Sequence, residues 1–169
     1  GRLVARAMAQ RKGEFDIVAI NDVGSSPKVH AHLFKYDTVQ GKFDGTVEHD
    51  ENSLVINGDR IRVCTEKDPA KLPWGELGAS IIIESTGAFT NKNNGKKAGY
   101  DDHIKAGAKK VILSAPAKDA IDATVVRSVD RSARILPRGA CGSVLAVQRH
   151  TVSGRREARR DGAEPPSLD

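Results

Sequence analysis

The sequence has few of the features that mark membrane, secreted or metal-binding proteins. Its two cysteines, Cys64 and Cys141, lie far apart without metal-ligand spacing, so we expect free thiols and no metal. It contains no apolar run of about 18 residues, which excludes a membrane-spanning helix and a membrane partner. No charged and apolar leader opens it, so the sequence predicts a cytoplasmic protein.

Lysine is absent from residues 131–169, and this change in composition predicts a boundary near residue 130. Residues 1–130 carry 19 Lys and Arg against 18 Asp and Glu, whereas residues 131–169 carry 8 Arg against 4 acidic residues. We expect a folded domain over 1–130 and a divergent, Arg-rich, partly disordered tail over 131–169. Because the basic charge belongs to the tail, nucleic acid is not an expected partner of the folded part.

Apolar and polar segments alternate in a pattern that predicts an α/β fold. Helices are expected over 2–10, 27–34 and 100–108, with Leu3, Val4 and Ala7 on one face of the first. Strands are expected over 15–20, 80–84, 110–113 and 123–126. Runs 53–56 and 60–64 flank an Asn-Gly turn and predict an antiparallel hairpin. The spacing indicates βαβ units and a mostly parallel, Rossmann-like sheet.

The segment from Ile81 to Phe89 carries the first functional signal. Three consecutive isoleucines, suited to a strand buried on both faces, are followed at once by Glu84, Ser85, Thr86 and Gly87. A buried strand that opens into small polar residues is typical of the carboxyl edge of a parallel sheet, where open α/β folds bind their ligands. The segment therefore predicts a nucleotide site.

Asp22 lies just after a predicted strand and about twenty residues after Gly1, which opens a helix. In dinucleotide-binding folds an acidic residue at this place accepts hydrogen bonds from the adenine-ribose hydroxyls. An Asp after a strand is also an ordinary turn residue. The complete Gly-x-Gly-x-x-Gly turn is not in the sequence, so spacing alone leaves both interpretations open.

Several multi-residue motifs occur together and in order, and they carry a resemblance to a known family. They are Val18-Ala-Ile-Asn-Asp22, His32-Leu-Phe-Lys-Tyr-Asp37, Gly41-Lys-Phe-Asp-Gly45, Asp68-Pro-Ala-Lys-Leu-Pro-Trp-Gly75, Ile83-Glu-Ser-Thr-Gly87 and Ala106-Gly-Ala-Lys-Lys-Val-Ile-Leu-Ser-Ala-Pro-Ala117. Over about residues 1–126 the chain resembles the amino-terminal, NAD-binding half of phosphorylating glyceraldehyde-3-phosphate dehydrogenase of the bacterial type. Gly1-Arg2-Leu3 resembles the end of that family's first glycine-rich segment. The resemblance therefore implies that the first strand is missing.

The resemblance assigns roles to the matching positions. It implies NAD as the cofactor, with Asp22 at the adenine ribose, Ser114 toward the nicotinamide end and the backbone of Thr86 and Gly87 close to the dinucleotide. Other cofactor-binding positions implied by it are Lys67 and Phe89 near the adenine and Arg2 beside the glycine-rich segment. Three positions also have plain structural interpretations: Lys67 as a solvated charge, Phe89 as core and Ser114 as a turn residue.

Cys141 is the candidate nucleophile. It follows Ile135 in the register of the family's catalytic cysteine, but the Thr-Thr-Asn that should come after it is missing. A thiolate in this role needs a helix amino terminus and a histidine base. His150 lies too close in sequence to match that base, so we read it as a surface histidine and expect no turnover from this chain. Residues 91–99 are longer than the family's usual loop, as an insertion or a sequence error.

Three functional readings follow from these observations. In the first, the chain is the NAD-binding part of a dehydrogenase whose full-length relatives form homotetramers and use glyceraldehyde 3-phosphate and inorganic phosphate, as the resemblance implies. In the second, it is a truncated nucleotide-binding module with weak polyanion affinity through its basic tail. In the third, it is a partial or frameshifted reading of a longer gene with no separate function.

Overall fold

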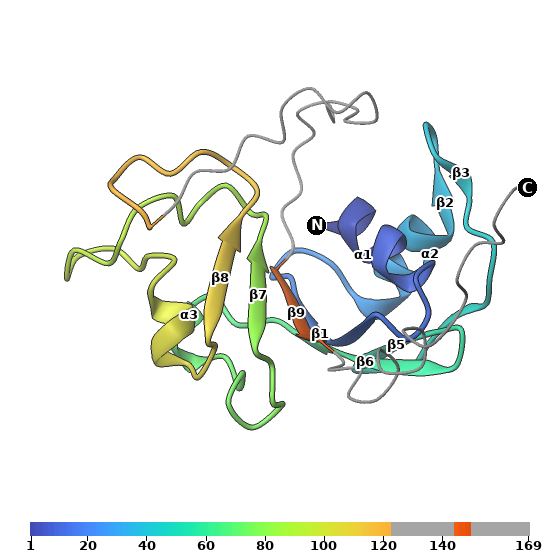
Figure 1. Cartoon of the computed structure of the whole chain (residues 1–169). Coiled ribbons are helices and arrows are strands. Elements are labelled where there is room, and N and C mark those ends of the chain that lie inside the picture. The colour runs from blue at the N-terminus through green and yellow to red at the C-terminus, as the bar shows by residue number, and fades with distance from the viewer. Residues whose placement is uncertain (123–143, 150–169) are drawn as a thin grey trace, which may run out of the picture.

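A computed structural model describes residues 1–122 and 144–149 (Figure 1). Its main sheet has seven strands in the order β4-β5-β6-β1-β9-β7-β8, and β2 and β3 form a separate two-stranded sheet. The strands are β1 (Phe15–Asn21), β2 (Tyr36–Asp37), β3 (Gly41–Lys42), β4 (Val47–His49), β5 (Ser53–Ile56), β6 (Asp59–Cys64), β7 (Ile81–Glu84), β8 (Lys110–Leu113) and β9 (Val144–Arg149). The helices are α1 (Arg2–Ala9), α2 (Pro27–Lys35), the single 3-10 turn η1 (Pro69–Lys71) and α3 (Asp102–Lys105).

The directions of the strands confirm the α/β, Rossmann-like fold class. β1 pairs with β6 in parallel, and β7 pairs with β8 in parallel. β9 lies between these two pairs and is antiparallel to both β1 and β7. The four strands β6, β1, β7 and β8 therefore all run in one direction, and their carboxyl ends lie at the same edge of the sheet. Because successive side chains of a strand point to opposite faces of the sheet, one strand can contribute residues to cores on both faces.

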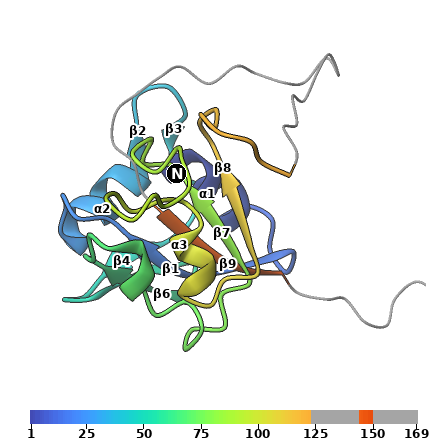
Figure 2. The same ribbon diagram turned by 90° about the vertical axis from the view of Figure 1, so that its left-hand side faces the viewer.

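Two hydrophobic cores lie on opposite faces of the sheet. α1 and α2 cover one face, where Ile83 of β7 joins a core that includes Ile20, Phe34, Phe43 and Ile61. On the other face, the adjacent Ile82 packs into a core with Trp74, Leu72, Ala79 and Ala108. This alternation at two neighbouring residues shows why the predicted run of isoleucines belongs to a strand buried on both sides. Figure 2 shows the molecule from the side of α3 and β8.

The predicted hairpin forms at the expected turn. β5 and β6 pair antiparallel, and Ile56 lies opposite Asp59 across Asn57 and Gly58. Both turn residues have positive φ, 54° for Asn57 and 93° for Gly58. A two-residue turn of this kind matches the right-handed twist of the strands, which explains the preference for Asn-Gly. β4 extends the hairpin on its outer side, at a position that the sequence did not predict.

The buried face of α1 differs from the prediction because it includes a charged side chain. Ala5 and Arg6 are buried, whereas Ala7 is exposed. Arg6 donates hydrogen bonds to the carbonyl oxygens of Phe34 and Gly41, the latter over 2.9 Å. Its guanidinium carbon also lies 5.5 Å from the centre of the Phe43 ring. Arg6 therefore ties α1 to the end of α2 and to β3, and these partners make its burial possible.

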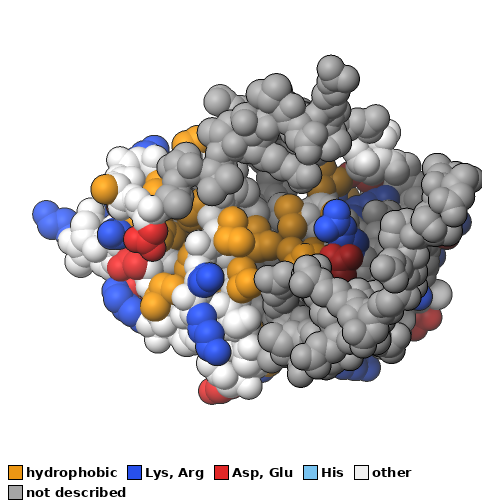
Figure 3. Space-filling view, in the orientation of Figure 1, with side chains coloured by type: hydrophobic (Ala, Val, Ile, Leu, Met, Phe, Trp, Pro, Cys, Tyr) orange, Lys and Arg blue, Asp and Glu red, His pale blue; other side chains and the backbone are white. Residues whose placement is uncertain are grey.

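Other boundaries differ in smaller ways from those predicted. The helix expected over 100–108 is reduced to the single turn α3, and the strand expected over 123–126 lies outside the described residues. β9 falls inside the expected tail and was not predicted. The sheet is less fully covered at β8, where Ile112 is 52% exposed, and Figure 3 shows hydrophobic side chains in this region of the surface. None of the helices in the described residues is long and apolar enough to cross a bilayer.

Candidate nucleotide site at the carboxyl edge of the sheet

The carboxyl edge of the sheet collects most of the residues that the sequence singled out. Along it, Lys67 follows β6, Asp22 follows β1, Thr86 and Gly87 follow β7, and Ser114 follows β8. Adjacent strand ends are joined by backbone hydrogen bonds: Asp22 N donates to Cys64 O over 3.0 Å, and Ser114 N donates to Glu84 O over 2.9 Å. The fold thus brings together segments that are far apart in the sequence.

Asp22 is buried at the end of β1, with 5% of its surface exposed. Its Oδ1 accepts a hydrogen bond from Gly24 N over 2.7 Å, which forms a tight turn after the strand. Its Oδ2 lies 3.8 Å from Nε2 of His30 on α2. The turn role of Asp22 is therefore observed, and its role at the adenine ribose stays a prediction.

Lys67 reaches this edge through its neighbours in the chain. The side chain of Asn21 donates from Nδ2 to Glu66 O over 3.0 Å and accepts from Glu66 N over 2.9 Å. This paired contact fixes Glu66 and Lys67 beside the end of β1. Lys67 itself is exposed, and it lines a shallow pocket together with Asn93, Lys96 and Lys97.

The loop after β7 is built around the carboxylate of Glu84. Oε1 of Glu84 accepts hydrogen bonds from the backbone N of Thr86 over 2.6 Å and from the Thr86 hydroxyl. That hydroxyl in turn accepts from Ala88 N over 3.1 Å. Gly87 follows with φ of +73°, and a Cβ placed there would meet no atom within 4 Å. The backbone at Gly87 is therefore open to a ligand.

Arg2 and Phe89 have partners of their own within the protein. Arg2 Nη2 forms a 2.8 Å ion pair with Asp37 Oδ2, and Asp37 is largely buried. Phe89 packs edge-on against the His103 ring, with the ring centres 6.3 Å apart.

Two buried polar atoms at this edge have no hydrogen-bond partner among the described residues. They are Nε2 of His30, which faces Asp22, and Oγ of Ser85, which lies between Glu84 and Thr86. An unsatisfied buried polar atom costs free energy of about 1–3 kcal/mol, so such atoms point to a missing partner. Together with the Asp22 carboxylate and the open Gly87 backbone, they fit the hydroxyl groups and polar edges of a nucleoside.

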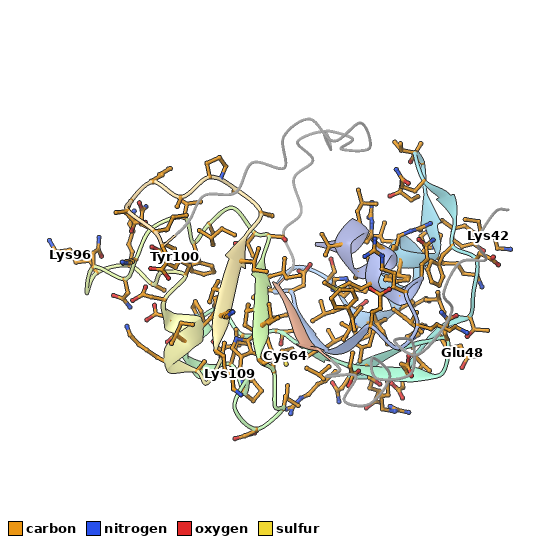
Figure 4. The ribbon with its side chains drawn as sticks, viewed as in Figure 1. Lys42, Glu48, Cys64, Lys96, Tyr100 and Lys109 are labelled. Atoms are coloured by element: carbon orange, nitrogen blue, oxygen red, sulfur yellow. The ribbon has the colours of Figure 1, made fainter. Side chains whose placement is uncertain are left out.

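The segment 91–99 is held in place by a buried carboxylate. Both oxygens of Asp102 accept hydrogen bonds from Asn93 Nδ2, over 2.9 and 2.8 Å, and Oδ2 also accepts from Gly99 N over 2.8 Å. Figure 4 shows Lys96 at the outer end of this segment and Tyr100 closer to the sheet. Gly99 has no room for a side chain, because a Cβ there would lie 2.2 Å from Asn93 N. Residues 91–99 therefore form an ordered loop beside the edge, and their interpretation as an insertion stays a prediction.

Of the two cysteines, Cys64 is described and Cys141 lies outside the described residues. Cys64 ends β6 as a free thiol, and burial raises its pKa, while Arg62 acts in the opposite direction. A raised pKa lowers the thiolate fraction and makes Cys64 a poor nucleophile. The described residues contain no group of three or more His, Cys, Asp or Glu side chains arranged to hold a metal ion.

The sequence predicted Asp22, Thr86 and Gly87 at this edge, but it gave no sign of His30 or His103 there. These two residues lie on α2 and α3, and their spacing in the sequence matches no motif. Only the packing of α2 and α3 brings them close to Asp22 and Glu84.

Residues 1–92 match the family model described as the NAD-binding domain of glyceraldehyde 3-phosphate dehydrogenase. The chain is also similar to curated proteins named glyceraldehyde-3-phosphate dehydrogenase. It is 47% identical to that of Streptomyces coelicolor over 131 residues, which cover 78% of this chain and 37% of the relative. It is 50% identical to that of Thermotoga maritima over 127 residues, covering 75% and 36%. The chain thus spans well under half the length of these relatives.

Proposed function

Because this chain belongs to the glyceraldehyde-3-phosphate dehydrogenase family through its NAD-binding domain, we propose that the carboxyl edge of its sheet binds NAD. NAD is the cofactor of this domain, and the two buried atoms without a hydrogen bond to a described residue, Nε2 of His30 and Oγ of Ser85, are the observation that supports the site. Asp22 would accept hydrogen bonds from the adenine-ribose hydroxyls, and the backbone of Thr86 and Gly87 would contact the dinucleotide.

The other residues at the edge would orient the two ends of the cofactor. Lys67, fixed by the contact of Glu66 with Asn21, would lie near the adenine, and Phe89 would offer an apolar face there. Ser114, held by its backbone to Glu84 O, would lie toward the nicotinamide. Arg2, already paired with Asp37, would contribute its charge near α1. When bound, NAD supplies the hydride acceptor for the family's reaction.

We further propose that a chain of this length does not turn over glyceraldehyde 3-phosphate. The reaction needs an activated thiolate and a positioned base. Cys64 is a poor nucleophile because of its raised pKa, and Cys141 lacks the expected flanking sequence. Glyceraldehyde 3-phosphate and inorganic phosphate would be substrates of longer relatives, and those relatives would assemble as homotetramers. Phosphate-dependent formation of NADH from glyceraldehyde 3-phosphate by this chain would overturn the proposal.

The binding test is a calorimetric titration of the chain with NAD. Asp22→Ala should weaken the affinity by about tenfold or more, because it removes a charged acceptor of the ribose hydroxyls. Asp59→Ala is the matched control, since Asp59 is an exposed carboxylate at the start of β6, far from its carboxyl end. Absence of NAD binding by the wild-type chain would contradict the site.

Calorimetric titrations with RNA and with NAD at several salt concentrations separate this function from the alternative of a nucleotide-binding module with polyanion affinity. The 8 arginines of residues 131–169 motivate that alternative. If it holds, RNA binding weakens steeply with added salt, whereas NAD affinity changes little. RNA binding that is independent of salt, or no RNA binding, would argue against it.

A further inference from the structure

A line of buried polar side chains lies directly behind the proposed cofactor loop. Nε1 of Trp74 donates to Nδ1 of His103 over 3.0 Å, and Nε2 of His103 lies 3.2 Å from Oε2 of Glu84. Trp74 and His103 are fully buried, and Glu84 is 2% exposed. The three side chains come from the loop after η1, from α3 and from the end of β7. They link the second core to the carboxyl edge.

The chemistry of the donors allows only one direction for this chain of hydrogen bonds. The indole N–H of Trp74 can only donate, so Nδ1 of His103 must be the acceptor and carries no proton. The proton of the neutral imidazole is therefore on Nε2, which donates to Glu84. A proton on Nδ1 would place two donors face to face in a buried site, which is costly.

The same chain continues into the loop. The second carboxylate oxygen of Glu84 accepts both the backbone N–H and the hydroxyl of Thr86, and the Thr86 hydroxyl accepts from Ala88 N. With its proton on Nε2, His103 donates to Oε2 of Glu84 while Thr86 donates to Oε1, so the two carboxylate oxygens are held by different partners. Glu84 in turn fixes the backbone on both sides of Gly87. Phe89 closes the arrangement by packing edge-on against the His103 ring.

We propose that His103 is a positioning residue for the cofactor site. As a neutral imidazole with its proton on Nε2, it holds Glu84 so that the loop from Thr86 to Ala88 keeps the conformation that contacts the dinucleotide. This inference rests on the proposed binding of NAD at that loop. In this proposal His103 does not contact the dinucleotide itself; it acts through Glu84 and Phe89, which it contacts.

The energetics favour a specific arrangement over simple packing. Burying three hydrogen-bonding side chains is costly unless every group is satisfied, and a fully satisfied network selects one geometry. An apolar residue at position 103 could fill the same volume but would leave Trp74 Nε1 and Glu84 Oε2 without their partners. The protein would then keep its hydrophobic core, but the loop from Thr86 to Ala88 would no longer be held in one conformation.

Nitrogen NMR of the cofactor-free protein tests the tautomer. Nε2 of His103 should give the signal of a protonated imidazole nitrogen and Nδ1 that of an unprotonated one, with assignment from the His103→Gln spectrum. Trp74→Phe keeps an aromatic ring but removes the indole donor, so the fixed tautomer should be lost. A protonated Nδ1 in the wild-type protein would overturn the inference.

Three variants test the link to the loop. His103→Leu and Thr86→Val should each speed amide hydrogen exchange at Gly87 and Ala88 and raise the Kd for NAD by about tenfold, the effect of losing one charge-assisted hydrogen bond. His103→Gln, which keeps an amide donor toward Glu84, should recover most of the affinity. His49→Gln, at an exposed histidine on β4, is the control.

The outcomes distinguish this inference from the proposed function. If His103→Leu lowers the thermal stability but leaves loop exchange and NAD affinity unchanged, the role is only structural and the inference fails. If His103→Leu does not fold, the loop exchange and the NAD affinity of Trp74→Phe decide the matter, because that variant removes the donor that fixes the tautomer and leaves His103 and the ligand-contacting residues in place. A wild-type protein with the expected tautomer and loop effects that does not bind NAD supports the loop contact and overturns the cofactor assignment.

Discussion

The backbone of Gly75 lies so close to Gly107 that Gly107 has no room for a side chain. A Cβ on Gly107 would lie 2.7 Å from both the Cα and the N of Gly75. Gly75 N also donates to Ala106 O over 3.0 Å, which fixes the turn after α3 against the loop that carries Trp74. This contact sets the position of α3, and with it that of His103.

Gly107→Ala should therefore destabilise the protein by about 3 kcal/mol or more, because it combines a backbone clash with a φ of +106°. Gly95→Ala is the matched control: its φ is +78°, but a Cβ there meets no atom within 4 Å. The control should cost only about 1 kcal/mol of conformational strain. Urea unfolding of the two variants measures the difference, and equal losses would contradict the role of the close contact.

Removing the buried charge of α1 should be costly. Arg6→Met keeps much of the apolar stem of Arg6 but leaves the carbonyl oxygens of Phe34 and Gly41 without their donor. The free energy of unfolding should fall by about 2–4 kcal/mol, measured by denaturant titration. Arg11→Met, at an exposed arginine near the end of the same helix, should change it by less than about 0.5 kcal/mol. A loss at Arg6 no larger than at Arg11 would contradict the anchoring role.

Asp102 should make stability depend on pH in the acid range. Burial alone would raise the pKa of Asp102, but hydrogen bonds from Lys105, Gly99 and Asn93 lower it below its usual value. A lowered pKa in the folded state adds stability above the unfolded pKa of about 3.9, and this contribution is lost as pH falls through the folded pKa.

The difference in unfolding free energy between wild type and Asp102→Asn should therefore be largest near neutral pH and shrink in acid. Thermal unfolding over a pH series measures it. Glu48→Gln, at an exposed carboxylate on β4 (Figure 4), is the control. A difference that stays constant down to the lowest pH would show that the charge of Asp102 is not what stabilises the segment 91–99.

Tyr100 should ionise only under strongly alkaline conditions. Burial, then the hydrogen bond to Asp119 and the nearby negative charges, raise the pKa of Tyr100 to about 12. The sequence has two tyrosines, so Tyr36→Phe leaves Tyr100 as the one phenol to follow by absorbance. Since its folded pKa lies above the ordinary value, the fold should lose stability as pH rises above about 10. Asp119→Asn should lower the pKa of Tyr100, and an unchanged pKa would contradict the contact.

A chain that ends before Val144 should be markedly less stable than the chain of 169 residues. The facing edges of β1 and β7 would lose the main-chain partners that β9 provides. Amide exchange at Ile20 and Ile82 should accelerate, and the thermal midpoint should fall. A chain that ends after Arg149 keeps β9 and is the control. Equal midpoints for the two shortened chains would show that β9 contributes nothing to the sheet.

Much of the fold could be predicted because local chemistry determines it. The Asn57-Gly58 turn, the strand with Ile82 and Ile83, and the strand from Lys110 to Leu113 all follow from period and turn preference. The buried Arg6 could not be predicted, because its partners are backbone carbonyls on other elements. α3 was predicted too long: after one turn the chain bends at Gly107, where the contact with Gly75 fixes a positive φ.

The candidate site divides in the same way. Asp22, Thr86 and Gly87 follow strands, so their place at the edge was visible in the sequence. Lys67, Phe89, Ser114 and Arg2 were assigned through family resemblance, and their contacts with NAD stay predictions. His103 stands nineteen residues after Glu84, and only the packing of α3 against β7 makes them neighbours. No residue pattern along the chain encodes that distance.

The position of β9 also has a consequence for how the protein is made. β9 is the last strand along the described residues, but it lies in the middle of the sheet, where Ala146 pairs with both Ala19 and Ile82. During synthesis β1 and β7 therefore leave the ribosome long before β9. Until β9 follows, the facing edges of β1 and β7 stay unpaired. Such edges attract other chains, and contacts between distant residues form slowly. The nascent protein should depend on chaperones until β9 is synthesised.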